Sequence, residues 1–252
     1  MLSVWDQKCG WSRDTNKFKT ILKERLDFWA TETSDYFLSK SIETLPEWSQ
    51  RFWKLTEVLS NDNKTSTQSL QFPVSFDIIH SNGALSDESF RTRDEYERFL
   101  NKTSSSLNVN GIWIVICYNE PKLFAEFLKR GNQMFGEDNN QQEHHSDTIV
   151  EFGSPGIFQC RSKIKDVQEY MQQEVPLRIA TTSAPYNMTT ERIFPFAWFE
   201  SHVQNSPGLQ IICDIPLDMY TSMSRQSPRK HIAEDAQNLF SWYRLVVVTK
   251  NK

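Results

Sequence analysis

The sequence has little glycine, no long apolar run and no excess of positive charge. Its 252 residues include only 8 glycines. No apolar segment approaches the roughly 20 residues that a membrane-spanning helix needs. The formal net charge is −4, so the whole chain does not attract a polyanion, and any such site has to be a local patch. These absences argue against a membrane protein and against a basic nucleic-acid binder.

Cysteine is also sparse, and its spacing points to one kind of compartment. Cys9, Cys117, Cys160 and Cys213 are widely separated and form no C-x-x-C pair. We therefore expect reduced thiols. The segment Met1–Asp6 lacks the basic region and apolar run of a signal peptide. We expect an intracellular protein, nuclear or cytoplasmic and not secreted.

The sequence gives no sign of a metal centre or a covalent nucleophile. His144 and His145 are adjacent, but no cysteine or carboxylate stands at ligand spacing from them. Serine, cysteine and histidine show no arrangement of nucleophile and base. We predict no metal and no catalytic side chain.

The most informative stretch is a strand, a helix and a second strand. The apolar run Val74–Ile79 breaks at His80–Gly83, and residues 96 to 107 then carry apolar side chains on one helical face. The turn Asn108–Gly111 follows, and its glycine is expected to take the positive φ of a tight reversal. Ile112–Cys117 is continuously apolar. This pattern predicts a βαβ unit of a parallel sheet, with ligands bound at the polar end of the first strand.

Other apolar runs repeat this alternation. Strands are predicted at Leu2–Trp5, Leu26–Ala30, Phe52–Leu59 and Trp242–Val248, an antiparallel pair at Thr148–Phe152 and Gly156–Cys160, and a strand with its exit within Met188–Phe199. Ser34 is expected to cap a helix that ends at Pro46, and Gly131 is expected to end a helix that begins after Asn119. The segment Gln204–Glu234 is read as irregular. We predict an α/β fold with a seven-stranded, mostly parallel sheet and an antiparallel last strand.

An ordered set of short matches extends over nearly the whole chain. They lie at Leu2–Gly10, Thr31-Glu32, Asn61-Asp62, Phe76–Ile78, Leu107–Gly111, Met134–Gly136, Glu169-Tyr170, Tyr186–Met188 and Ser241–Tyr243. In this order and spacing the sequence resembles the eukaryotic mRNA cap (guanine-N7) methyltransferases. The resemblance implies a Rossmann-like class I methyltransferase fold and S-adenosylmethionine as methyl donor. It implies a single domain, 1–252, with residues 133–185 as an inserted cap-binding subregion.

The resemblance also implies a substrate and a mechanism. The substrate is the capped 5′ end of an RNA, and another capping or activating subunit is an expected partner, with no membrane. Guanine N7 is already nucleophilic and a sulfonium is a good methyl donor, so the protein has only to align them in a dry pocket.

Five residues are implied in cofactor binding. They are Lys8, Gly10, Glu32, Asp62 and Asn82. Glu32 is expected to bind the ribose diol and Asp62 the adenine amino group, while Asn82 faces the cofactor. The carboxyl ends of parallel strands lie at one edge of a sheet. Asp6, Glu32, Asp62 and Asn82 should therefore converge on one cleft. A solvated loop side chain is the alternative interpretation for each.

Two residues are implied in recognition of the acceptor. Glu169 is expected to pair with the N1 and N2 donors of guanine, and Tyr243 to enclose the base. A surface acid and a core aromatic residue are the respective alternatives.

The first loop departs from the family pattern. Trp5, Gln7 and Cys9 are aligned with family glycines, where a Cβ blocks the approach to the cofactor. Losing two or three hydrogen bonds should weaken cofactor binding by about 30- to 150-fold, and restoring glycine at positions 5 and 7 should strengthen it. A catalytically silent binding or regulatory subunit and a small-molecule methyltransferase are the alternatives. A nicotinamide dehydrogenase is disfavoured by the missing glycines.

Overall fold

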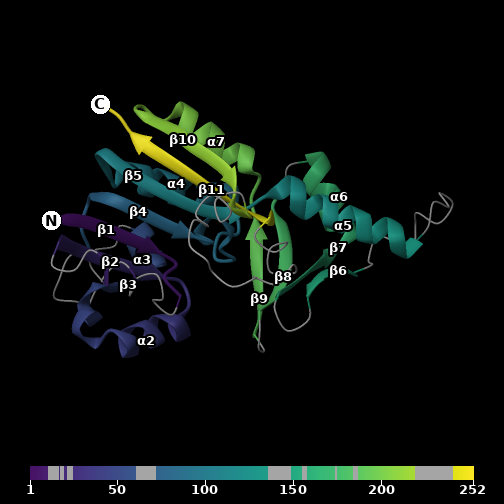
Figure 1. The fold of residues 1–252 in the computed structure, drawn as a ribbon, viewed down its shortest axis with the longest axis horizontal. Coiled ribbons are helices and arrows are strands. Elements are labelled where there is room, and N and C mark those ends of the chain that lie inside the picture. Colours follow the sequence, from purple (N-terminus) through teal and green to yellow (C-terminus); the bar gives the residue numbers. More distant parts are fainter. Residues whose placement is uncertain are drawn as a thin grey trace, which may run out of the picture.

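A computed structural model describes residues 1–10, 17, 20–21, 25–60, 72–135, 149–154, 158–173, 175–183, 187–218 and 241–252. Seven of its strands span Leu2–Gln7 (β1), Leu26–Glu32 (β2), Phe52–Lys54 (β3), Phe76–Asn82 (β4), Leu107–Tyr118 (β5), Leu209–Pro216 (β10) and Tyr243–Lys250 (β11). They form one sheet in the order β10-β11-β5-β4-β1-β2-β3 (Figure 1). Strands β1 to β5 pair in parallel, and β11 is antiparallel to both neighbours. The predicted α/β fold with its antiparallel last strand is confirmed.

Helices cover both faces of this sheet. The helical segments span Asp35–Thr44 (α2), Pro46–Arg51 (η2), Leu55–Ser60 (α3), Ala84–Ser86 (η3), Arg93–Ser105 (α4), Glu120–Phe135 (α5), Ile164–Gln173 (α6) and Phe196–Asn205 (α7). On one face, residues of α3, α4 and α7 share a core cluster with Trp5 and Trp113. On the other face, Val4 and Phe28 pack with side chains of α2. As predicted, Ser34 caps α2 by accepting a hydrogen bond from the Phe37 amide.

A second sheet is inserted between β5 and β10. Its strands, Ile149–Ser154 (β6), Phe158–Lys163 (β7), Leu177–Ser183 (β8) and Asn187–Ile193 (β9), are antiparallel in the order β6-β7-β8-β9. The predicted antiparallel pair is confirmed as β6 and β7. This sheet begins within the predicted subregion 133–185 and continues to Ile193. It stands beside the ends of the main-sheet strands, and α5 and α6 pack against it (Figure 1).

Three local predictions were wrong. The strand predicted at Phe52–Leu59 ends at Lys54 and continues as α3, because Leu55 and Val58 are spaced for one helical face and both are buried. Helix α5 continues past Gly131, since one interior glycine costs only about 1 kcal/mol. The segment read as irregular contains β10, whose exposed Ile212 obscures the strand pattern.

The turn predicted at Asn108–Gly111 is a bulge inside β5. The β4–β5 register shifts between Phe76 and Ile78, and Asn110, not Gly111, has the positive φ of 65°. Gly111 is required for close packing instead. A Cβ atom there would lie 2.8 Å from the Asn108 carbonyl oxygen and 3.1 Å from that of Asp77.

Candidate functional site

The candidate site lies where the sheet reverses its strand order. Strand β1 has β2 on one side and β4 on the other, all parallel. Open α/β sheets bind ligands outside the carboxyl ends of the strands at such a point of reversal, and we refer to this region as the crevice. The turn after β1, the end of β2 and the loop after β4 therefore form its rim.

The turn after β1 contains two left-handed residues. Lys8 has φ 56° and Gly10 has φ 55°. The Cys9 amide donates to the Thr31 carbonyl at 3.1 Å, and the Gly10 carbonyl accepts from the Ser41 hydroxyl at 2.6 Å. Residues with such a positive φ on either side of Cys9 make a tight turn of a kind that favours glycine at both positions. The chain therefore places lysine at the first of these positions and keeps glycine at the second.

This geometry corrects the predicted alignment of the loop. Trp5 and Gln7 belong to β1 and are fully buried. The Trp5 indole donates to Thr31 Oγ1 at 3.0 Å, and the Gln7 amide donates to Thr103 Oγ1 at 2.9 Å. Both are core residues, so the prediction that Trp5, Gln7 and Cys9 replace family glycines was wrong. The expected 30- to 150-fold loss of affinity depended on that alignment and no longer follows.

Glu32 ties the turn after β1 to the end of β2. The residue is only 1% exposed. Its Oε2 atom accepts the Gly10 amide at 2.8 Å. Its Oε1 atom accepts the amides of Thr33 at 2.8 Å and Ser34 at 3.2 Å, and the Thr33 hydroxyl at 3.2 Å. The carboxylate that was predicted for ribose therefore also holds the rim of the crevice in place.

An ion pair spans the crevice from the turn after β1 to the loop after β4. Lys8 Nζ lies 3.5 Å from Asp87 Oδ2 and 3.4 Å from the Gly83 carbonyl oxygen. Asp87 Oδ2 also accepts the Thr33 hydroxyl at 3.0 Å. Contacts thus run from β1 through Asp87 to the end of β2.

Burial and charge act in opposite directions on this pair. Burial lowers the pKa of Lys8, but the carboxylates of Asp87, Glu191 and Glu32 outweigh it and raise the pKa. Burial raises the pKa of Asp87, but the Lys8 ammonium and nearby hydrogen bonds outweigh it and lower the pKa. Both side chains are therefore charged at neutral pH.

The second sheet reaches the same crevice. Ser86 in η3 donates to Glu191 Oε2 of β9 at 2.8 Å, and Thr181 donates to Glu191 Oε1 at 3.2 Å. Neither Asp87 nor Glu191 was predicted as a site residue. No local pattern marks them, because both are brought to the crevice by strands and loops far apart in sequence.

A buried pair of polar side chains lies beneath the rim. Asp6 and His80 are partners across β1 and β4, with His80 Nδ1 2.9 Å from Asp6 Oδ1. Both are buried. Asp6 was predicted to lie at this edge of the sheet. His80 was not named as a candidate site residue, although it directly follows an apolar run and therefore marks a strand end, as Asp6 does.

The remaining predicted cofactor residues are placed as follows. Asn82 is the last residue of β4 and is exposed at the same sheet edge as Glu32. Asp62 lies outside the described residues. Asp6, Glu32 and Asn82 thus stand at or near the carboxyl ends of parallel strands of one sheet. That they line one cleft and bind the cofactor stays a prediction.

The two predicted acceptor residues lie on different elements. Glu169 lies on α6 with its side chain 46% exposed, 3.8 Å from Lys165. Tyr243 opens β11, and its ring stacks on that of Tyr118 with the centroids 5.0 Å apart. Burial raises the pKa of Tyr243. It therefore packs at the junction of the two sheets, while Glu169 faces outward from α6.

The described ranges also bear on thiols, membrane-spanning helices and metal sites. All four cysteines are free. None of the helices in the described ranges is long and apolar enough to cross a membrane. Within those ranges, no three or more His, Cys, Asp or Glu side chains form a group that could hold a metal ion, and His144 and His145 lie outside them.

Two solved structures are similar to this fold over nearly the whole chain. An S-adenosylmethionine-dependent methyltransferase from Clostridium acetobutylicum ATCC 824 is similar to 99% of this chain over 84% of its own length, with a TM-score of 0.54 and 12% identity. The chain has the methyltransferase fold. A protein from Listeria monocytogenes assigned as an S-adenosylmethionine-dependent methyltransferase matches 100% of this chain over 90% of its own, with a TM-score of 0.54 and 13% identity. No family model and no curated protein sequence gives a significant match.

Proposed function

We propose that this chain is an S-adenosylmethionine-dependent methyltransferase that acts on N7 of the guanosine cap of mRNA. The observation that carries the first part is the cluster of Lys8, Asp87 and Glu32 at the carboxyl ends of neighbouring parallel strands within a methyltransferase fold. The acceptor is proposed from the ordered sequence resemblance described above.

The charged side chains at the crevice are complementary to the polar groups of S-adenosylmethionine. Its methionine end is a zwitterion, so the carboxylate would bind Lys8 and the ammonium would bind Asp87, each in place of part of the present ion pair. Glu32 lies on the side of β2 and would bind the ribose hydroxyls. Among the residues that the structure describes, a Cβ atom added at Gly10 or at Gly83 would meet no atom within 4 Å. The described part of the chain therefore does not fill the space beside either glycine.

The chain's own part in the reaction would be positioning. The bound cofactor would supply an electrophilic methyl group, and an acceptor such as guanine N7 needs no base to remove a proton. The rim residues would fix the donor, and the second sheet, joined to the crevice by Ser86 and Glu191, would help to exclude water.

A silent binding or regulatory subunit is the second candidate. Lys8 occupies a left-handed position that glycine adopts without strain, at a cost of about 1 kcal/mol or more. In addition, Glu32 already accepts hydrogen bonds from three backbone amides and lies 3.2 Å from the Thr33 hydroxyl, whose one proton it shares with Asp87. Both observations favour a crevice that is closed by the chain's own side chains.

Calorimetric titration with S-adenosylmethionine and S-adenosylhomocysteine separates these candidates. For an enzyme, the unmodified chain binds both. Lys8→Met and Asp87→Asn each weaken binding by roughly 10- to 100-fold, because each removes one charge-assisted hydrogen bond of about 1.5–3 kcal/mol. Lys165→Met is the matched control, since Lys165 is exposed and pairs only with Glu169 among the ion pairs of the described chain.

The acceptor is tested separately by transfer of a labelled methyl group to RNA with a GpppG cap. We expect transfer to the capped RNA and none to the same RNA with a 5′ triphosphate. Cofactor binding without transfer to the cap would contradict the cap assignment and leave a methyltransferase with another acceptor. No binding of either cofactor form would favour the silent subunit.

A further inference from the structure

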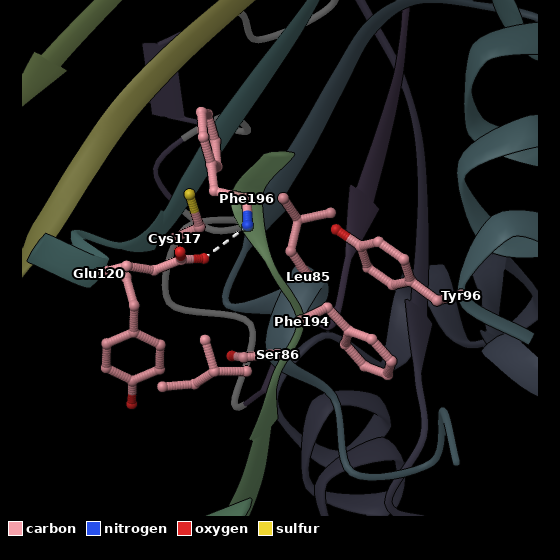
Figure 2. A pocket seen from close by; sticks show the side chains of 9 residues that line it. Leu85, Ser86, Tyr96, Cys117, Glu120, Phe194 and Phe196 are labelled. Atoms are coloured by element: carbon pink, nitrogen blue, oxygen red, sulfur yellow. Dashed lines mark hydrogen bonds between the residues drawn. The ribbon is translucent and has the colours of Figure 1, made fainter. Parts of the chain in front are cut away.

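A small cavity lies beside the crevice, at the carboxyl ends of β4 and β5. Its volume is about 20 Å³, room for one water or the tip of a larger ligand. Its walls come from η3, α4, β5, the start of α5 and the segment that returns from β9 to α7 (Figure 2). Ser86 belongs to this wall and precedes Asp87, so the cavity and the cofactor crevice share the loop after β4.

Most of the cavity wall is apolar. Tyr96 and Phe194 stack with ring centroids 4.3 Å apart, and Phe196 closes another side. Burial raises the pKa of the Cys117 thiol, so this side chain lines the cavity in its neutral form. A charged group in such surroundings is unfavourable unless a partner of opposite charge or a hydrogen-bond donor meets it.

Glu120 is the acidic group of this wall. Its Oε1 atom accepts the Phe196 amide at 2.6 Å (Figure 2). Burial raises the pKa of Glu120 to about 7, although hydrogen bonds from the Tyr170 side chain and the Phe196 amide, and then the Arg244 charge, act to lower it. Arg244 itself binds Asp214, with Nε 2.9 Å from Oδ1, and its guanidinium lies over the Phe196 ring at 3.8 Å. Arg244 therefore forms its ion pair with the Asp214 carboxylate.

We infer that the Glu120 cavity anchors the acceptor through a nitrogen group that donates N–H hydrogen bonds. Two sources have this chemistry, the amino edge of a purine and an aliphatic ammonium, and both suit a carboxylate between aromatic walls. The position beside the crevice puts the anchored group at the strand ends where the methyl donor would lie. In this respect the inference rests on the proposed function. It gives the acceptor contact to Glu120 and not to Glu169.

The test uses two probes and two glutamate variants. GpppG and butylammonium are titrated by calorimetry into the unmodified chain, Glu120→Gln and Glu169→Gln, with and without S-adenosylhomocysteine. Gln keeps an oxygen for the Phe196 amide, so Glu120→Gln is expected to fold. Binding of one probe should weaken roughly 10- to 100-fold in Glu120→Gln, the loss of one charge-assisted contact, and stay unchanged in Glu169→Gln.

A second measurement needs no variant. The Glu120 carboxyl carbon, followed by NMR in the unmodified chain, should titrate at lower pH when the probe is bound, because a donor or cation favours the ionised form.

The outcomes are distinct. Selective loss with GpppG identifies a purine edge, and selective loss with butylammonium identifies an amine. Equal affinity in Glu120→Gln and the unmodified chain overturns the inference, as does the absence of binding by both probes at millimolar concentration. Failure to bind S-adenosylhomocysteine alone would count against the proposed function and leave the anchor intact, since the probes are also titrated without it.

Discussion

Lys8 and Trp5 lie three residues apart and have different structural roles. Trp5 points into the core from within β1, whereas Lys8 stands in the turn that follows and reaches across the crevice to Asp87. The change happens within one turn, because β1 ends at Gln7 and Lys8 takes a left-handed conformation. A shift of a few residues in the alignment therefore exchanges a core position for a position in the turn at the strand end.

At this scale we predict that Trp5→Ala destabilises the protein strongly. Trp5 is 0% exposed, and its ring centroid lies 5.2 Å from that of Phe72 and 5.4 Å from that of Phe76. Truncation leaves a cavity and removes the bond to Thr31, so the free energy of unfolding should fall by about 3–5 kcal/mol. Urea denaturation measures this.

Tyr36→Ala is the matched control, because that ring is 57% exposed, and surface truncations usually change stability by about 0.5 kcal/mol or less. A loss below about 1 kcal/mol for Trp5→Ala would show that the side chain is not packed as described.

Strand β5 contains a bulge where it pairs with β4. The strand makes a left-handed residue at Asn110 and brings Gly111 against the carbonyls of Asn108 and Asp77 before it continues beside β4. A bulge of this kind bends a strand and shifts its register. The bulge sets which β5 residues pair with Ile79 and Ser81. It therefore also sets where β5 ends relative to the crevice.

We predict that Gly111→Ala lowers the free energy of unfolding by about 1–3 kcal/mol, the usual cost of overpacking. The added methyl would meet the Asn108 carbonyl oxygen at 2.8 Å and a Leu107 methyl at 2.9 Å, and backbone atoms cannot yield as a flexible side chain can. Thermal unfolding followed by circular dichroism measures the effect.

Gly83→Asn is the comparison variant. Gly83 has φ 71° and open space at its Cβ position, and asparagine tolerates this conformation better than other residues. If Gly83→Asn were as destabilising as Gly111→Ala, steric contact would not be the reason for the glycine in the bulge.

At the scale of the whole molecule, the chain leaves the main sheet at Glu120 and returns at Phe196. The hydrogen bond from the Phe196 amide to the Glu120 carboxylate joins residues 76 positions apart. It connects the start and the end of the segment that contains the second sheet. Arg244 and Asp214 pair close by, on the last two strands of the main sheet. A titratable group therefore stands where the two sheets meet.

We predict that Glu120 makes stability depend on pH. Because burial raises its folded pKa to about 7 from the ordinary 4.5, the folded chain keeps a proton that the unfolded chain releases. Its contribution is therefore complete below about pH 4.5 and is lost as the pH rises to about 7. At about 1.4 kcal/mol per unit the loss is on the order of 3 kcal/mol.

Glu120→Gln should remove this slope, while Glu169→Gln, whose side chain is largely solvated, should keep it. The measurement is urea denaturation at a series of pH values between about 4 and 8. An unchanged slope in Glu120→Gln would contradict the burial of this carboxyl.

The sequence by itself determined the class of the fold and most of its elements. The alternation of apolar runs with helical periods decided a parallel sheet, and the βαβ unit from Val74 to Cys117 corresponds to β4, α4 and β5. Ser34 marked the start of α2. These features follow from local periods of two and 3.6 residues and from capping chemistry, which one stretch of chain contains in full.

Only the tertiary structure decided which residues form the site. Lys8 meets Asp87, Ser86 meets Glu191, and Glu120 meets Phe196. These pairs are set by the order of strands in the sheet and by the return of the inserted sheet, which no local period encodes. The left-handed turn at Lys8 likewise depends on where β1 stops pairing with its neighbours, because backbone conformation there is fixed by the sheet and the rim contacts and not by the residue's own preference.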